Sequence, residues 1–224
     1  MNIIVISLER AKERREKIKA QLEALKIGAV IMDAVDGQAL TDSQKNKFIN
    51  NPIGWRTGEL FKPGEIGCLM SHIKALKLAK ENKWEYVIIL EDDTILSNEF
   101  EKGINFLFKI APKDWEHIFL SGHIYLQGPP VFQPSLVPIN FKVSGAYSYI
   151  VRNTIYDLFL SELSKMEVPV DDVVEILTFR NPIIKSYLFF PFLTYSSLEN
   201  SYIWNEQNQT KVHSSFKYFK NKIY

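Results

Sequence analysis

Unbroken apolar runs alternate along this chain with stretches in which apolar residues recur every three or four positions. The clearest run covers residues 87–90 and leads directly into three acids, Glu91, Asp92 and Asp93. Apolar residues without alternation predict a strand buried on both faces, as in a parallel sheet. Ile3–Ser7 has the same character, and the residues that follow it show helical periodicity. The pattern therefore predicts an α/β fold.

The predicted elements form one domain, because no internal repeat or linker divides the chain. Gly28 favours the end of the first helix, and Pro63 with Gly64 favours the start of the next one. We expect the strands to form a mostly parallel sheet. The periodicity predicts helices over residues 9–27, 65–82, 98–110, 153–165 and 171–179, and strands over residues 3–7, 29–32, 84–90, 117–120, 142–151 and 183–190.

Composition narrows the class of protein without identifying it. The chain has 224 residues, 46% of them hydrophobic, which is enough for a substantial core. A net charge of +1 gives no field that would attract nucleic acid. Cys68 is the only cysteine, which excludes an internal disulfide framework and fits a reducing compartment. The apolar start is too short for a signal peptide or a membrane span, so we expect a cytoplasmic protein.

The acidic triplet is the strongest chemical signal in the sequence. Ligands of open α/β folds bind at the carboxyl ends of the strands, where these acids are expected. Their mutual repulsion is relieved by a divalent cation, and carboxylate oxygens are ligands that Mg²⁺ and Mn²⁺ prefer. If the strand continued to Asp93, alternation would place Glu91 and Asp93 on one side and Asp92 on the other. The competing interpretation is a solvated acidic turn.

Five short segments follow one another over about residues 3–172. They are Val5-Ile-Ser-Leu8 with Arg10 to Arg15, Asp33-Ala-Val-Asp-Gly37, Gly64-Glu-Ile-Gly-Cys-Leu-Met-Ser-His72, Leu90-Glu-Asp-Asp93 and Pro169-Val-Asp-Asp172. In this order they resemble glycosyltransferase family 25, the lipooligosaccharide glycosyltransferases related to collagen galactosyltransferases. Each segment alone is a weak signal, whereas the combined order is specific.

The resemblance implies a single GT-A-like domain with a Rossmann-like nucleotide-binding half. That half would cover about residues 1–121, the acceptor half about 122–205, and a basic and aromatic tail about 206–224. It further implies a UDP-sugar as donor, Mn²⁺ or Mg²⁺ as cofactor, and inversion at the anomeric carbon. The implied reaction moves a hexose, preferably galactose from UDP-galactose, onto a terminal sugar of bacterial lipooligosaccharide or lipopolysaccharide.

The acidic element of the family maps onto Glu91, Asp92 and Asp93. We expect Glu91 and Asp93 to hold the metal and Asp92 to contact the sugar donor. Because the element begins here with Glu rather than Asp, metal ligation by Asp93 is the firmer expectation. His72 belongs to another segment of the resemblance and is expected at the sugar donor or the acceptor. The alternative for His72 is a buried side chain satisfied by a backbone carbonyl.

An inverting transfer needs a general base that takes the proton of the attacking hydroxyl. Asp171 and Asp172 follow Pro169 in the last of the five segments, and we expect Asp171 to be the base. The alternative is helix capping, because Asp near a helix N-terminus is common.

Four further residues are candidates for binding the sugar donor. Arg10 and Arg14 share one helix face close after Ser7, where guanidinium groups suit a diphosphate. The alternative is a salt-bridged helix surface, to which we assign Lys12, Glu13, Glu16 and Lys17. Asp36 is expected at a ribose hydroxyl or the uracil edge, although an Asp-Gly turn also explains it.

The C-terminal tail interleaves basic and aromatic residues and has no acid after Glu206. That composition suits an anionic membrane surface, and so a peripheral contact near a lipid-linked oligosaccharide acceptor on the cytoplasmic face of the bacterial inner membrane. A solvated tail is the alternative, and nothing upstream supports nucleic acid.

Three other functions remain to be weighed. One is transfer of glucose or an N-acetylhexosamine by the same fold, and another is an inactive sugar-binding or assembly module. The third is a phosphate-handling hydrolase, which is disfavoured because such enzymes need Asp where this chain has Glu91.

Overall fold

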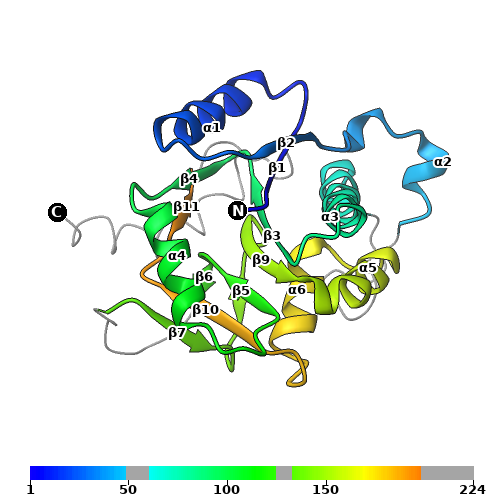
Figure 1. Ribbon diagram of the computed structural model, residues 1–224. Helices are drawn as coiled ribbons and strands as arrows, with labels where there is room; N and C mark the ends of the chain where they lie inside the picture. Colours follow the sequence, from blue (N-terminus) through cyan, green and yellow to red (C-terminus); the bar gives the residue numbers. More distant parts are fainter. Residues whose placement is uncertain (49–60, 125–132, 198–224) are drawn as a thin grey trace.

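The computed structural model describes residues 1–48, 61–124 and 133–197. They form three layers, in which one large sheet lies between two layers of helices (Figure 1). Strands of this sheet are β1 (Ile3–Ser7), β2 (Val30–Asp33), β3 (Tyr86–Glu91), β5 (His117–Phe119), β7 (Ser135–Pro138), β9 (Ser148–Arg152) and β10 (Ser186–Phe190). Two small antiparallel pairs join β4 (Thr94–Leu96) with β11 (Thr194–Ser196) and β6 (His123–Ile124) with β8 (Val143–Ser144).

The main sheet is mixed, and five of its seven described strands, β2, β1, β3, β5 and β10, run in the same direction, as expected of a mostly parallel sheet. Its strand order is β2-β1-β3-β9-β5-β10-β7. In the part of the chain that the structure describes, β1 pairs in parallel with β2 and β3, and β5 with β10. The strand β9 runs against both its neighbours, β3 and β5, and β7 runs against β10. The α/β class is confirmed, but the expected parallel pairing is interrupted in the middle of the sheet by β9.

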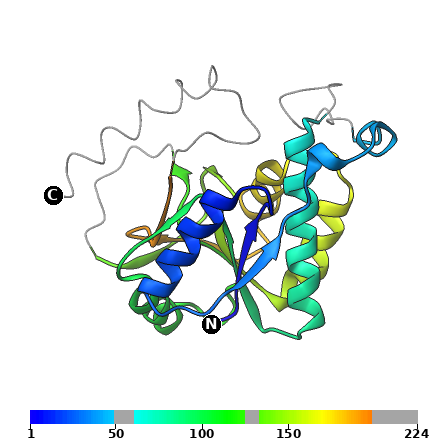
Figure 2. The same ribbon diagram turned by 90° about the horizontal axis from the view of Figure 1, so that it is seen from above.

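Helices cover both faces of the sheet, as the two views show (Figure 1, Figure 2). One core contains residues of α1 (Lys12–Ala24) and α4 (Phe100–Ile110), among them Ile18 and Ile104. The other core contains residues of α3 (Pro63–Glu81), α5 (Tyr156–Ser164) and α6 (Val170–Thr178), among them Leu69 and Phe159. Short helical turns η1 (Gly37–Ala39), α2 (Asp42–Lys45) and η2 (Asn153–Ile155) complete the described elements.

The buried strands explain why the unbroken apolar runs form the centre of the molecule. Every residue of β1 is buried, with Ile4 and Ile6 in one core and Ile3 and Val5 in the other. Full burial of an aliphatic side chain contributes roughly 1.5–3 kcal/mol, so both faces of such a strand stabilise the fold. The prediction of strands buried on both faces is confirmed for β1 and β3.

The remaining predicted elements agree with the structure apart from their ends, with two exceptions. The strand predicted over residues 142–151 is two strands, β8 and β9, separated by Gly145 at a φ of 103°. The strands β4, β6, β7 and β11 were not predicted. The tail over residues 206–224 lies outside the described residues. Among the described helices, none is both long and apolar enough to cross a membrane.

Candidate active site

The three acids lie where β3 ends, and their side chains diverge. The strand stops at Glu91, and Asp92 and Asp93 form the turn into β4. Because the strand does not continue to Asp93, strand alternation does not orient this residue. The expectation that Glu91 and Asp93 share one side of a strand therefore does not apply. Each acid has different neighbours: Glu91 faces α3, Asp92 contacts the end of β1, and Asp93 lies near α1.

Asp92 is held by two elements that precede it by more than 70 residues. Ser7 Oγ donates a hydrogen bond to Asp92 Oδ2 at 2.8 Å, and Arg14 Nη1 lies 3.4 Å from Asp92 Oδ1. Burial is the largest influence on Asp92 and raises its pKa, although Ser7 and Arg14 oppose this effect. Ser7 itself is buried, so it affects the site by positioning Asp92 and not by direct contact with a ligand.

Asp93 carries a negative charge that the surrounding protein only partly compensates. Arg14 Nη1 lies 3.8 Å from Asp93 Oδ2. The other oxygen, Oδ1, is buried and has no hydrogen-bond partner among the residues that the structure describes. Burial and the nearby Glu91 charge raise the pKa of Asp93 to about 7. A buried carboxylate oxygen without a partner is where a cation would be stabilised, so this donor set fits Mg²⁺ or Mn²⁺.

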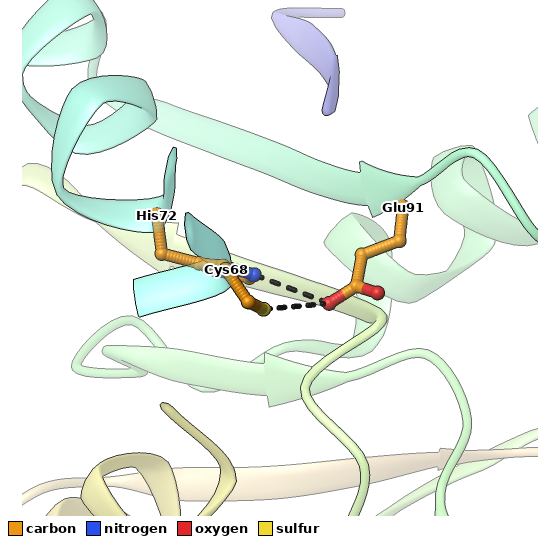
Figure 3. A group of neighbouring side chains, drawn as sticks. All are labelled: Cys68, His72 and Glu91. Carbon is orange, nitrogen blue, oxygen red and sulfur yellow. Dashed lines mark hydrogen bonds and ion pairs between the residues drawn. The ribbon is translucent and has the colours of Figure 1, made fainter. Parts of the chain in front are cut away.

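Glu91 is bound from the other side by a helix (Figure 3). His72 Nε2 lies 3.3 Å from Glu91 Oε1, and Cys68 Sγ donates to the same oxygen at 3.6 Å. The hydroxyl of Tyr149 shares a 2.7 Å hydrogen bond with His72 Nδ1. Burial acts to raise the pKa of Glu91, but its interactions with His72 and Cys68 outweigh burial and lower the pKa. His72 is fully buried, so it acts on the site through Glu91.

Two of the five segments meet through their glycines. A Cβ added at Gly67 would lie 2.5 Å from Val35 O, and one added at Gly37 would lie 1.5 Å from Pro63 O. Ser71 Oγ accepts a hydrogen bond from the Val35 N–H at 2.8 Å. The loop after β2 therefore packs directly on α3 because neither glycine carries a side chain. This contact fixes one wall of the site.

One pocket brings most of the predicted residues together. Its lining includes Arg10, Arg14, Asp36, Glu91, Asp92 and Asp93. Arg10 Nε donates to Asp36 Oδ2 at 2.6 Å, and this bond holds the pKa of Asp36 below its usual value. Asp36 Oδ1 also accepts from the Gln38 N–H at 2.9 Å, so the Asp-Gly turn, which was the alternative interpretation of Asp36, is present as a cap of η1.

Asp171 and Asp172 lie in the first turn of α6, and neither residue lines this pocket. Asp171 is exposed, and its Oδ1 accepts a hydrogen bond from the backbone N–H of Ala146 at 2.8 Å. Although the residue as a whole is exposed, neighbouring protein desolvates its carboxyl group, and this effect together with the nearby Glu91 charge raises the pKa of Asp171 to about 6. Glu91, His72 and Asp171 are thus close enough to interact electrostatically. Asp172 is half-buried.

The structure also shows residues that the sequence interpretation left out. Arg15 Nη2 donates to Asp33 Oδ1 and to Ser7 O, both at 2.7 Å, and so ties α1 to the ends of β1 and β2. Cys68 and Tyr149 support Glu91 and His72. Cys68 had a visible signal, because it precedes His72 by four residues on a helix. The exposed helix surface was predicted correctly, including the Glu13–Lys17 ion pair at 2.9 Å.

Comparison with known proteins gives a family and several relatives. The family model described as glycosyltransferase family 25 (LPS biosynthesis protein) matches residues 1–174. Procollagen galactosyltransferase 2 from Mus musculus is 27% identical over 243 residues, which cover 92% of this chain and 38% of that protein. Inactive glycosyltransferase 25 family member 3 from Mus musculus is 26% identical over 195 residues, which cover 80% of this chain and 32% of that protein.

The chain therefore spans well under half the length of these relatives. Among solved structures, a glycosyltransferase involved in the glycosylation of the major capsid of PBCV-1 superposes with a TM-score of 0.48 at 11% identity. That superposition covers 84% of this chain and 81% of the other.

Proposed function

The chain belongs to glycosyltransferase family 25, and from this premise we propose that it transfers a hexose from a UDP-sugar to a sugar hydroxyl. Galactose is the preferred candidate for the hexose. The observation that carries the proposal is the only partly compensated negative charge at the end of β3. Asp93 Oδ1 is buried without a partner among the described residues, beside Glu91 and at the pocket that Arg14 also lines. Such a site suits a divalent cation and the diphosphate that accompanies it.

We assign the metal to Glu91 and Asp93, with Mn²⁺ or Mg²⁺ as the ion. When bound, this ion would neutralise charge on the departing diphosphate. Arg14 contributes further positive charge on the same wall and orients Asp92 and Asp93. Arg10 and Asp36 line the other end of the pocket, where we propose that they contact the nucleotide.

We assign the general base to Asp171. In an inverting transfer the acceptor oxygen attacks the anomeric carbon from the face opposite UDP, and its proton passes to the base. Asp171 is exposed, so an acceptor hydroxyl can reach it, and its raised pKa lies closer to neutral pH than that of an ordinary carboxylate. The hydrogen bond from Ala146 holds one carboxylate oxygen and leaves the other for the acceptor proton.

For the acceptor we propose a terminal sugar of lipooligosaccharide or lipopolysaccharide, which agrees with the description of the matching family. We propose with it that the protein acts in the bacterial cytoplasm, at the inner face of the membrane where a lipid-linked acceptor would lie. A peripheral contact through the tail over residues 206–224 is part of this proposal, and that tail lies outside the described residues.

A catalytically inactive module is the second candidate function. It is favoured by a relative that is named an inactive member of the same family. The acidic cluster of this chain argues against it, because carboxylates held together repel one another without a cation, and perturbed carboxylates in a pocket are typical of functional sites.

One assay separates the two functions. The protein is incubated with a panel of UDP-sugars, Mn²⁺ and a sugar acceptor, and free UDP is measured. We expect release of UDP with one donor, loss of release with EDTA, and no loss in the matched control Asp114→Asn, because Asp114 is exposed on a distant turn. Absence of turnover with every donor, with and without acceptor, would contradict the transferase function and favour the inactive module.

A further inference from the structure

Three side chains of different chemistry converge on one point beside the acidic cluster. Cys68 and His72 project from the same face of α3, and Glu91 meets them from the end of β3 (Figure 3). Their ligand atoms, a thiol sulfur, an imidazole nitrogen and a carboxylate oxygen, all lie within 4.8 Å of one another. From this convergence we propose that Cys68, His72 and Glu91 form a second cation site, selective for a thiophilic divalent ion such as Zn²⁺.

The two separations that involve Glu91 Oε1 fit a tetrahedral ion. Bond lengths of about 2.3 Å for Zn–S and about 2.0 Å for Zn–N and Zn–O place sulfur and oxygen ligands about 3.5 Å apart, and nitrogen and oxygen ligands about 3.3 Å apart. The observed distances are 3.6 Å from Cys68 Sγ to Glu91 Oε1 and 3.3 Å from His72 Nε2 to Glu91 Oε1. Three protein ligands leave the fourth position to water, as in an open zinc site.

The surroundings of His72 are those of a metal ligand. Its Nδ1 shares a 2.7 Å hydrogen bond with the hydroxyl of Tyr149, and the two rings stack with an interplanar angle of 9°. Ligating histidines typically hydrogen-bond through their other ring nitrogen, which fixes the ring and leaves one nitrogen for the ion. The hydroxyl oxygen of Tyr149 can accept a hydrogen bond from the Nδ1–H of His72, and the unprotonated Nε2 is then available to ligate.

The chemistry of this site differs from that of the diphosphate site. Glu91 and Asp93 offer only oxygen to the diphosphate site, which suits Mg²⁺ and Mn²⁺, whereas a thiolate and an imidazole select zinc. Cys68 and Glu91 both line the pocket, so an ion can enter from solvent. Glu91 belongs to both sites, but the zinc proposal does not depend on sugar transfer.

A structure held by hydrogen bonds alone is the competing explanation. In that case the Cys68 thiol and the His72 N–H both donate to Glu91 Oε1, and no ion binds. The measurement must therefore detect a bond between the metal and the sulfur. Because Cys68 is the only cysteine in the chain, any thiolate–metal signal comes from this residue.

The test is titration of the whole protein with Co²⁺, a spectroscopic substitute for Zn²⁺. We expect one equivalent to give a thiolate-to-cobalt charge-transfer band that Zn²⁺ abolishes. The band should be present in Asp93→Asn and absent in Cys68→Ser, and Zn²⁺ affinity should fall at least about tenfold in Cys68→Ser and His72→Gln. No band in the natural sequence, equal Zn²⁺ affinity in Cys68→Ser, or loss of the band in Asp93→Asn would overturn the proposal.

A second measurement uses only the natural protein, so it remains informative even if the variants fail to fold. The rate at which a thiol reagent modifies Cys68 is followed in the natural protein with Zn²⁺ or with Mg²⁺. We expect Zn²⁺ to slow the reaction at least about tenfold and Mg²⁺ to leave it unchanged, since only a thiophilic ion occupies the sulfur. Equal rates would overturn the zinc site, and the UDP-release assay would still decide the transferase function separately.

Discussion

Ser7 and Asp92 are 85 residues apart in the sequence, yet Ser7 Oγ donates a hydrogen bond to Asp92 Oδ2 at 2.8 Å. The contact exists because β1 and β3 are parallel neighbours whose register pairs Ile6 with Glu91. Ser7 is the last residue of β1 and Asp92 directly follows β3, so the two residues lie side by side at the same edge of the sheet. Asp92 is thereby fixed against β1, which leaves Glu91 and Asp93 facing other partners.

Replacement of Ser7 by alanine tests this contact. Asp92 Oδ2 would lose its donor in a half-buried position, so we expect the free energy of unfolding to fall by about 1–3 kcal/mol. Urea denaturation at neutral pH measures the change. Ser43→Ala is the matched control, because Ser43 is exposed on α2. A loss no larger than that of the control would show that Asp92 is held by Arg14 alone.

Asp93→Asn should abolish metal-dependent binding of UDP. The substitution removes the charge of the carboxylate whose Oδ1 has no partner among the described residues, and an amide is a poor ligand for Mn²⁺. Calorimetric titration of UDP in the presence of Mn²⁺ measures the effect, with Asp114→Asn as the control. Unchanged affinity for UDP plus Mn²⁺ would move the metal away from Asp93.

The same residue gives a second expectation without metal. Because the pKa of Asp93 is raised to about 7, the folded protein holds a proton that the unfolded chain releases near pH 4. In the metal-free protein Asp93 therefore contributes stability that is lost as the pH rises from about 4 toward 7, so urea denaturation should show a gap between the natural protein and Asp93→Asn that changes across this range.

The parts of the site that follow directly from the sequence are those carried by local pattern. Apolar runs place β1 and β3 in the core, and the acids that follow β3 therefore lie at an edge of the sheet. The proline before Asp171 likewise marks the start of α6. Each of these features depends on a few adjacent residues, and for that reason periodicity and turn chemistry identify them.

The parts that could not be predicted depend on contacts between distant residues. The residues of β9 carry no signal that this strand lies antiparallel between β3 and β5. That insertion brings Tyr149 to His72, a partner 77 residues away. Likewise β4 pairs with β11 about a hundred residues later, and each strand is only three residues long. Short strands that pair over such separations leave little periodic signal.

Asp171→Asn should spare UDP binding and remove transfer. Loss of a general base typically lowers the rate about 10²–10⁴-fold. In the natural protein the base must be ionised, so kcat should fall below about pH 6 as the pH decreases, following the raised pKa of Asp171. Steady-state kinetics over pH 5–8 measures both effects. Asp172→Asn is the neighbouring control, and normal rates in Asp171→Asn would move the base to Asp172 or elsewhere.

His117 should make the fold sensitive to acid. It is fully buried in the sheet centre, and neither ring nitrogen has a hydrogen-bond partner among the described residues. Burial lowers its pKa to about 3. The unfolded chain binds a proton below pH 6.5 and the folded protein does not, so His117 contributes a loss of stability as the pH falls from about 6.5 toward 3, by up to about 1.4 kcal/mol per pH unit. His117→Phe should reduce that slope in urea denaturation, and an unchanged slope would refute the role of His117.

Gly67→Ala tests whether the packing of two backbones builds the pocket wall. The new Cβ would lie 2.5 Å from Val35 O and 2.7 Å from Gly37 N, and because both are backbone atoms the loop after β2 must move. We expect a loss of about 1–3 kcal/mol in stability. UDP binding should also weaken, because Asp36 leaves the pocket with that loop.

Gly28→Ala is the matched control for this change, since nothing lies within 4 Å of the added methyl group at Gly28. Its stability should therefore change little, and its UDP affinity should equal that of the natural protein. Thermal unfolding and UDP titration of both variants provide the comparison. If Gly67→Ala lost stability but bound UDP normally, the close approach of α3 and the loop would serve folding alone. Asp36 would then have no part in holding the nucleotide.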